Sequence, residues 1–246
     1  MSEKKNKERL DLLVLEQHPE LSRNQVQSFI MQGAVSVDGV VINKPGTPVA
    51  RTSLISVTNS KPPYVSRAGL KLEAALREFN IDVTDKIALD AGISTGGFTD
   101  CLLQHGAARV YGADVAYGQV HESISSDKRV VLLEKTNVRH LDRLPELVDI
   151  ITLDLSFISL LKVIPAVSQV LKPDGKIITL IKPQFEADRK DISRGGIVKD
   201  DAVHQKVIDK IITGMKEFGF ESKGVIESPI TGATAGNKEF LALFTR

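Results

Sequence analysis

The chain has 246 residues, of which 42% are hydrophobic, and its formal net charge at pH 7 is +1. This length suits one large domain with a smaller one, and the hydrophobic content is ordinary for a globular protein. The single cysteine, Cys101, excludes a disulfide framework, and the five histidines are not spaced as zinc ligands, so we expect no metal. We find neither an 18-residue apolar run nor the apolar core of a signal peptide, so we expect a cytoplasmic protein without membrane contact.

The charge is unevenly distributed along the chain. Residues 1–72 hold ten basic and six acidic side chains, a net charge of +4, which leaves −3 for the remainder. A basic N-terminal region predicts contact with a polyanion, although a solvated surface would show the same excess.

The N-terminal region has the pattern of two short helices followed by a hairpin. The first helix begins near Arg9, and the second begins at Ser22, which can form a capping box with Gln25. Gly33 ends the second helix, and the alternating residues 34–42 surround an Asp-Gly turn typical of a β-hairpin. These elements resemble the small RNA-binding domain named after ribosomal protein S4.

This resemblance covers residues 9–57 and implies that the second helix and the hairpin face RNA. Basic and amide side chains there would bind phosphates, which gives sequence-independent, salt-sensitive affinity. A small cap that only packs on the rest of the chain is the alternative. The expected RNA-binding residues are Arg23, Asn24, Gln27, Lys44 and, at the start of the next helix, Arg67.

Domain limits follow from composition. The Pro- and Ser-containing residues 59–66 predict a linker between an RNA-binding domain, 1–58, and a larger domain, 67–246.

From about residue 86, seven strands alternate with helices, and the last two strands follow each other so closely that one must be antiparallel. This order predicts an α/β fold with a mostly parallel sheet. We also expect a helix over residues 160–171 and a lid over residues 184–200.

A glycine-rich turn follows the first strand of the larger domain. Residues 90–100, "DAGISTGGFTD", join this strand to a helix, where glycines allow close approach of a ligand and the helix offers free N–H groups. An acidic residue before such a turn resembles the first motif of S-adenosylmethionine-dependent methyltransferases. A second acidic residue, Asp114, follows the next strand, where a carboxylate could hold ribose hydroxyls. A tight structural turn without a ligand is the alternative.

The resemblance implies S-adenosyl-L-methionine as the cofactor. Asn137 follows the third strand, near the adenine in methyltransferases of this shape, and Asp154 follows the fourth, at the sheet edge where ligands bind. The residues expected to bind the cofactor are Asp90, Gly92, Ser94, Thr95, Gly96, Gly97, Phe98, Asp114, Asn137 and Asp154.

A lysine, Lys182, follows another buried strand, which is an unusual place for a charge, although its side chain could extend to solvent. In sequence order, Lys71, Asp154, Lys182 and Glu239 match the Lys-Asp-Lys-Glu tetrad of FtsJ-like ribose 2′-O-methyltransferases. The motifs "YVSRAGLKL", "IKPQFE" and "GNKEF" are similar to those of the TlyA family, in which an S4-like domain precedes an FtsJ-like methyltransferase. The expected fold of the larger domain is therefore the class I Rossmann-like methyltransferase fold.

The resemblance implies methyl transfer to a ribose 2′-hydroxyl, with ribosomal RNA or ribosomal subunits as the partner. A ribose hydroxyl is a poor nucleophile, so its oxygen must be aligned with the methyl group and partly deprotonated. An amine can take that proton only after losing its own, which a second cation and limited hydration favour. We expect Lys182 to be the base, Lys71 to orient it, and the two carboxylates, Asp154 and Glu239, to hold the ammonium groups and the hydroxyl.

Three other functions remain open. Enzymes that methylate base amino groups often carry (Asn/Asp)-Pro-Pro-(Tyr/Phe) after the fourth strand, and residues 154–157, "DLSF", keep the ends of that motif but lack its prolines. A non-catalytic RNA- or ribosome-binding factor would not need a complete glycine turn and tetrad. A cytolysin would need amphipathic or apolar membrane segments, which we do not find in the sequence.

Overall fold

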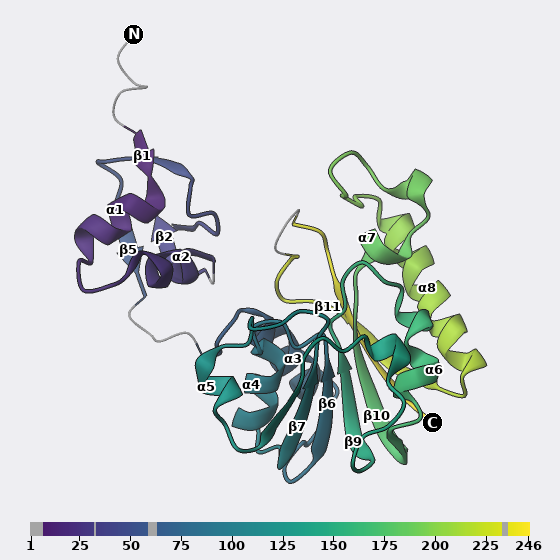
Figure 1. Cartoon of the computed structure of the whole chain (residues 1–246). Coiled ribbons are helices and arrows are strands. Elements are labelled where there is room, and N and C mark those ends of the chain that lie inside the picture. Colours follow the sequence, from purple (N-terminus) through teal and green to yellow (C-terminus); the bar gives the residue numbers. More distant parts are fainter. Residues whose placement is uncertain (1–6, 32, 59–62, 233–235) are drawn as a thin grey trace. The chain divides into compact units, whose positions relative to one another are not determined.

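A computed structural model of the chain describes residues 7–31, 33–58, 63–232 and 236–246 (Figure 1). The chain forms two compact units, residues 1–67 and 68–246. Part of the predicted linker, residues 59–62, lies outside the described residues, and the predicted limits of the two domains stay a prediction.

The first unit combines helices with two small antiparallel sheets. Strand β1 pairs with β4, and β2 pairs with both β3 and β5. The described elements are β1 (Lys7–Arg9), α1 (Leu10–Gln17), α2 (Arg23–Met31), β2 (Val35–Val37), β3 (Val40–Val41), β4 (Pro48–Ala50) and β5 (Ile55–Val57).

Local signals in the sequence explain the limits of these elements. The Ser22 Oγ accepts a hydrogen bond from the Gln25 N–H, and the Gln25 Oε1 accepts one from the Ser22 N–H at 2.8 Å, which confirms the predicted capping box. Gly33 ends α2 with a φ of +78°. Asp38 and Gly39 have φ angles of +51° and +81°, which are the left-handed conformations that a two-residue hairpin turn requires.

The core of the first unit comes from the apolar faces of its helices. Leu10 and Val14 of α1 lie four residues apart, as do Val26 and Ile30 of α2, so each pair shares one helix face. All four side chains are fully buried, and they pack with Val35 of β2. The polar face of α2, which carries Arg23, Gln25 and Gln27, is therefore left for other contacts.

The second unit is a sheet covered by helices on both faces. Helices α3 and α4 pack together on one face, whereas α6 and α8 cover the other (Figure 1). Its helices are α3 (Ala68–Glu78), α4 (Gly97–Gln104), α5 (Glu122–Ser125), α6 (Ile164–Val167), α7 (Pro183–Glu186) and α8 (Asp201–Glu217), with short 3-10 turns at Val138–His140, Leu160–Lys162 and Arg189–Asp191. Its strands are β6 (Ile87–Ala91), β7 (Arg109–Ala113), β8 (Val130–Leu133), β9 (Val148–Leu153), β10 (Leu171–Ile181), β11 (Glu221–Glu227) and β12 (Phe240–Thr245).

The seven strands lie in the order β11-β12-β10-β9-β6-β7-β8. Neighbouring strands from β8 to β10 are parallel, whereas β12 is antiparallel to both β10 and β11. This topology confirms the predicted class I Rossmann-like sheet of seven strands with one antiparallel.

The register of the strands brings distant parts of the chain to one edge. Ala91 at the end of β6 pairs with Leu153 at the end of β9. Ile181 at the end of β10 pairs with Phe240 at the start of β12. Because β6, β9 and β10 are parallel, the segments that follow them leave the sheet at its carboxyl edge, and the segment before β12 enters there.

One predicted helix is wrong in length. Residues 160–171 do not form a continuous helix but a 3-10 turn, the short helix α6 and the first residue of β10. Pro165 lies in the first turn of α6, where a missing N–H is tolerated, so it restarts the helix rather than continuing a preceding one.

Candidate active site

The glycine-rich turn lies between β6 and α4 at the carboxyl edge. Gly92 and Gly96 have φ angles of +91° and +96°, which favour glycine over residues with a side chain. A Cβ atom at Gly92 would also lie 2.5 Å from the backbone oxygen of Asp154. Only glycine therefore allows the turn to pass this close to the segment after β9.

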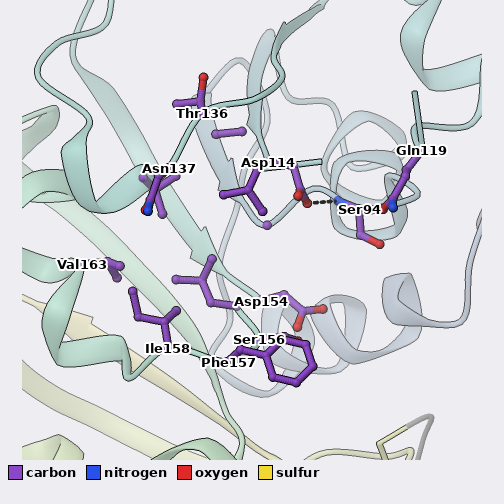
Figure 2. A pocket seen from close by; sticks show the side chains of 15 residues that line it. Ser94, Asp114, Gln119, Thr136, Asn137, Asp154, Ser156, Phe157, Ile158 and Val163 are labelled. Atoms are coloured by element: carbon purple, nitrogen blue, oxygen red, sulfur yellow. Dashed lines mark hydrogen bonds between the residues drawn. The ribbon is translucent and has the colours of Figure 1, made fainter. Parts of the chain in front are cut away.

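A pocket of about 470 Å³ opens beside this turn. It is lined by residues that follow β6, β7, β8 and β9, so the carboxyl edge of the sheet forms its floor. In Figure 2, Thr136 and Asn137 lie on one side of Asp114, and Ser94 and Gln119 lie on the other. The predicted cofactor-binding residues that line this pocket are Gly92, Ser94, Asp114, Asn137 and Asp154.

Asp114 is fixed by the backbone around it. Its Oδ2 accepts a hydrogen bond from the Ser94 N–H at 2.9 Å, and its Oδ1 accepts one from the Ala116 N–H at 2.9 Å. The carboxylate thus ties the glycine turn to the loop after β7. Each oxygen retains a lone pair that can accept a further hydrogen bond from a ligand.

Asp90 lies behind the turn instead of lining the pocket. It is fully buried, and its carboxylate accepts hydrogen bonds from Thr99 Oγ1 of α4 at 2.7 Å and from Thr152 Oγ1 of β9 at 2.9 Å. Burial raises the pKa of Asp90 to about 6, against the opposing effect of the two hydroxyl groups. Asp90 therefore joins β6, β9 and α4 and supports the turn from within.

The other residues predicted from the turn also lie outside the pocket lining. Thr95 is exposed, and its carbonyl accepts a hydrogen bond from the His121 N–H at 3.1 Å. Gly96 precedes α4, where an added Cβ would lie 3.1 Å from Ile124, and Gly97 and Phe98 are buried in the first turn of the helix. These residues shape the turn and pack it against the sheet.

Most of the remaining lining was missed from the sequence. It comes from loops whose path depends on tertiary packing, and the useful signal was their position directly after a parallel strand. The additional lining residues are Ala113, Val115, Gln119, Thr136, Val138, Leu155, Ser156, Phe157, Ile158 and Val163.

Lys182 and Asp154 form an ion pair next to the pocket. The Lys182 Nζ lies 2.6 Å from Asp154 Oδ1 and donates a hydrogen bond to Ser156 Oγ at 3.1 Å. Only 11% and 18% of the two charged side chains are exposed, so water screens the pair weakly. Within the described residues, Asp154 Oδ1 makes the ion pair but no well-aligned hydrogen bond, which leaves this oxygen able to accept one.

Lys71 and Glu239 form a second, more deeply buried ion pair. The Lys71 Nζ of α3 donates to Glu239 Oε2 at 2.5 Å, and the two side chains are 8% and 3% exposed. An added Cβ at Gly232 would lie 2.7 Å from Glu239 Oε1, so glycine there leaves room for the carboxylate.

Strand alternation explains why the two pairs share one side of the sheet. Leu153, Ile181 and Phe240 pack into the core formed with α6 and α8. Because successive residues of a strand face opposite sides, their neighbours Asp154, Lys182 and Glu239 are directed toward the α3 face. Lys71 meets them there from α3. The predicted tetrad is thus gathered at one edge as two ion pairs.

Sequence comparison identifies the family of this chain. The profile of the FtsJ-like methyltransferase family matches residues 64–246, and that of the S4 domain matches residues 8–55. The chain belongs to the FtsJ-like methyltransferase family. The predicted combination of an S4-like domain with a methyltransferase is therefore confirmed.

Relatives of this methyltransferase share both parts. Hemolysin A of Brachyspira hyodysenteriae is 42% identical over 239 residues, which cover 96% of this chain and 99% of the relative. The 16S/23S rRNA (cytidine-2′-O)-methyltransferase TlyA of Mycobacterium tuberculosis is 42% identical over 228 residues, which cover 92% and 85% of the two chains. A solved structure from Streptococcus thermophilus, named a candidate hemolysin, is 39% identical with a TM-score of 0.76 and covers 98% of this chain and 89% of its own.

The first unit, which contains the S4 domain and is called the S4 unit from here on, presents basic groups around a buried acid. Asp11 is fully buried, and its Oδ2 lies 2.7 Å from Arg9 Nη2, 2.9 Å from Gln27 Nε2 and 3.9 Å from Arg23 Nη2. The hydrogen bond from Arg9 lowers the pKa of Asp11 to about 2. The side chains of Arg9 and Arg23 remain 50% and 59% exposed, so they can reach a further anion.

The other predicted RNA-binding residues lie in different environments. Lys44 is exposed in the loop before β4, close in sequence to Gly46, where an added Cβ would lie 3.5 Å from the Arg9 guanidinium. Asn24 lies on α2, and Arg67 is partly buried directly before α3. Arg9 was not among the predicted RNA-binding residues. It lies at the start of the first predicted helix, where the sequence pattern shows no charged partner for it.

Among the described residues, no three His, Cys, Asp or Glu side chains are grouped so that they could hold a metal ion. No helix in this part of the chain is long and apolar enough to cross a membrane.

Proposed function

We propose that this methyltransferase transfers a methyl group from S-adenosyl-L-methionine to a ribose 2′-hydroxyl of ribosomal RNA. The observation that carries the proposal is the pair of lysine–carboxylate contacts, Lys182–Asp154 and Lys71–Glu239, at the sheet edge beside the pocket. Relatives named rRNA (cytidine-2′-O)-methyltransferase support the same reaction.

The pocket fits S-adenosyl-L-methionine in size and in the groups that it presents. Its volume of about 470 Å³ lies in the range of small-molecule sites. The fixed carboxylate of Asp114 would accept hydrogen bonds from the ribose hydroxyls, and Gly92 would allow the ligand close to the backbone. Thr136 and Asn137 would contact the adenine, and Ser94 and Gln119 would line the opposite side.

The cofactor, when bound, supplies an electrophilic methyl group on a sulfonium. The residues of this chain would then have to hold the 2′-oxygen in line and remove its proton. Lys182 would take that proton, and Asp154 and Ser156 would keep its amine directed at the oxygen. Lys71, held by Glu239, would help to orient the reacting groups at the same edge of the sheet.

The S4 unit would hold the RNA through its phosphates. The half-exposed guanidinium groups of Arg9 and Arg23 and the exposed ammonium of Lys44 offer donors that fit phosphate oxygens. Such contacts position an RNA without reading its sequence, so selection of the nucleotide would fall to the methyltransferase unit.

Base methylation is the second candidate, favoured by one observation. Phe157 lines the pocket and is 90% exposed, as an aromatic ring that could contact a base would be. The residues before it, Leu155 and Ser156, lack the prolines of the base-methylating motif.

Methyl transfer to ribosomal subunits tests the proposal directly. Unmodified 30S and 50S subunits would be incubated with radiolabelled S-adenosyl-L-methionine, and the RNA would be digested for nucleoside mass spectrometry. We expect one 2′-O-methylated nucleoside. A label on a base would favour the second candidate, and absence of both label and cofactor binding would contradict the proposal.

A further inference from the structure

Two segments carry the proposed catalytic pair and leave the sheet side by side. Residues 154–160 follow β9 and contain Asp154, and residues 154–158 of this segment line the pocket. Residues 182–186 follow β10 and contain Lys182. The geometry of the ion pair thus depends on how firmly these two segments are held together.

Phe157 shows that the first segment needs an external restraint. It has a φ of +65°, a left-handed conformation that is unfavourable for a residue with a bulky side chain. Because 90% of Phe157 is exposed, burial of this residue cannot compensate for the strain. Such a conformation persists only where the surroundings over-determine it.

Glu186, at the end of the second segment, supplies a restraint of this kind. It is only 3% exposed, and its Oε1 accepts a hydrogen bond at 2.7 Å from the N–H of Leu160, three residues after Phe157. The rings of Phe157 and Phe185 form a further contact between the two segments, with centroids 5.0 Å apart. The two segments are therefore joined at both ends, by Lys182–Asp154 and by Glu186–Leu160.

Helix α8 fixes Glu186 from the other side. The Lys210 Nζ donates a hydrogen bond to the Glu186 carbonyl oxygen at 2.6 Å and lies 4.0 Å from its Oε2. Burial raises the pKa of Glu186, against the lowering effect of the Leu160 N–H bond. A carboxylate in an unfavourable buried position, directed at a backbone donor of the neighbouring segment, indicates a role in positioning that segment.

We infer that Glu186 is a positioning residue that holds residues 154–160 against residues 182–186 and thereby sets both the Lys182–Asp154 geometry and one wall of the cofactor pocket. This inference rests on the proposed function for its catalytic consequence. Its structural consequence, an ordered segment 154–160, is independent of which acceptor is methylated.

Two substitutions at Glu186 separate positioning from charge. Glu186→Gln keeps an oxygen that can accept the Leu160 N–H, whereas Glu186→Ala removes it. We expect Glu186→Ala to speed amide hydrogen exchange at Leu160 about tenfold, as loss of one buried hydrogen bond implies. Because cofactor binding needs the ordered segment, affinity for S-adenosyl-L-methionine should fall by up to about tenfold in Glu186→Ala. The rate of methyl transfer by Glu186→Ala should fall about 100-fold. Glu186→Gln should stay within about threefold of wild type in amide exchange, cofactor affinity and transfer rate.

Leu160 offers a test from the donor side. Its N–H precedes a 3-10 turn, and Ser159 has φ and ψ of −72° and 138°, the conformation that a residue before proline prefers. Leu160→Pro should therefore remove the donor while keeping the backbone, and Leu160→Ala is the matched control that loses only side-chain packing. We expect Leu160→Pro to weaken cofactor binding beyond Leu160→Ala, and to add little to the effect of Glu186→Ala.

Met215→Ala is a control for general destabilisation, because Met215 is fully buried in α8 far along the chain from these segments. It should lower stability without changing local exchange at Leu160 or cofactor affinity. Unchanged exchange in Glu186→Ala, or equal losses of cofactor affinity in Met215→Ala, would overturn the inference. Failure of the wild-type protein to methylate RNA would contradict the proposed function only, since amide exchange still decides the role of Glu186.

Discussion

The two units of this methyltransferase each bury an aspartate beside a proposed binding surface, but they surround it differently. Asp11 in the S4 unit is held by guanidinium and amide donors, and the pKa of its carboxyl is lowered to about 2. Asp90 in the second unit is held by two threonine hydroxyls, and burial raises the pKa of its carboxyl to about 6. Neither side chain is accessible to solvent, but burial has the largest effect on the pKa of Asp90, whereas the hydrogen bond from Arg9 has the largest effect on the pKa of Asp11.

This difference matches the proposed tasks of the two surfaces. A full negative charge on Asp11 orients cations that stay exposed and can meet an RNA backbone. In the second unit, the lysines are shielded and paired with carboxylates at a sheet edge, which suits proton transfer more than attraction of a polyanion. Changes in one unit should therefore alter catalysis or RNA affinity, but not both.

The largest expected effect comes from Lys182. Lys182→Ala should lower the rate of methyl transfer about 10³-fold, because loss of a positioned general base typically removes between about 10² and 10⁴. Affinity for S-adenosyl-L-methionine and for RNA should stay within about twofold, as measured by calorimetry and filter binding.

A matched control for Lys182 lies on β10, the strand that precedes it. Lys176 of β10 is near the amino edge of the sheet, away from the pocket, so Lys176→Ala should leave transfer unchanged. Equal activity of Lys182→Ala and wild type would remove Lys182 as the base.

The pH dependence of stability should distinguish the two buried aspartates. The pKa of Asp90 is raised in the folded state, so its stabilising contribution is complete below about pH 4 and is lost as the pH rises through about 6. The loss corresponds to about 3 kcal/mol for a shift of about two units. Asp90→Asn should remove this pH-dependent loss, as seen by hydrogen exchange of β6 amides between pH 4 and pH 7.

Asp11 should behave in the opposite way. The pKa of Asp11 is lowered, so its contribution is present above about pH 4 and is lost as the pH falls through about 2. Because Arg9 is half exposed, the effect should be smaller than at Asp90. A matching pH profile for Asp11→Asn and Asp90→Asn would contradict the contrast between the two units.

A smaller effect is expected for RNA binding by the S4 unit. Arg23→Ala combined with Lys44→Ala should reduce the salt dependence of RNA binding by about two phosphate contacts, which corresponds to about a 20- to 60-fold loss of affinity at about 0.1 M salt. Cofactor affinity should not change. A wild-type affinity and salt slope in the double variant would remove these residues from the RNA contact.

Features of the fold and of the site could be predicted from the sequence where the residues that determine them are close together in the chain. The glycine turn could be predicted from a short local motif, whereas the tetrad was predicted from the resemblance to FtsJ-like methyltransferases, because periodicity alone does not single out Lys71. The sequence could not distinguish Asp90 as a buried support from Asp90 as a ligand-binding residue, since both need an acid before the turn. That role depends on Thr99 and Thr152, which only the fold brings to it.

Other features were hidden because they depend on contacts between loops. The apolar residues over 160–171 suggested one helix, although Pro165 interrupts it, and the bond from the Leu160 N–H to Glu186 joins two segments that are distant in sequence. The pocket wall formed by residues 155–158 likewise arises from the path of a strained loop, which no periodic pattern encodes. Tertiary packing decided these features against local propensity.

The smallest expected effect concerns helix caps, one in each unit. Ser22 caps α2, and Asp200 caps α8 through a 2.8 Å hydrogen bond from the Ala202 N–H to its Oδ1. Ser22→Ala should lower the free energy of unfolding of the S4 unit by about 1 kcal/mol, and Asp200→Ala should do the same for the second unit. Hydrogen exchange of amides in α1 and in β6 would report the two units separately. If either substitution weakens both sets of amides equally, the two units unfold together, and the division of tasks between them would have to be tested in the intact chain alone.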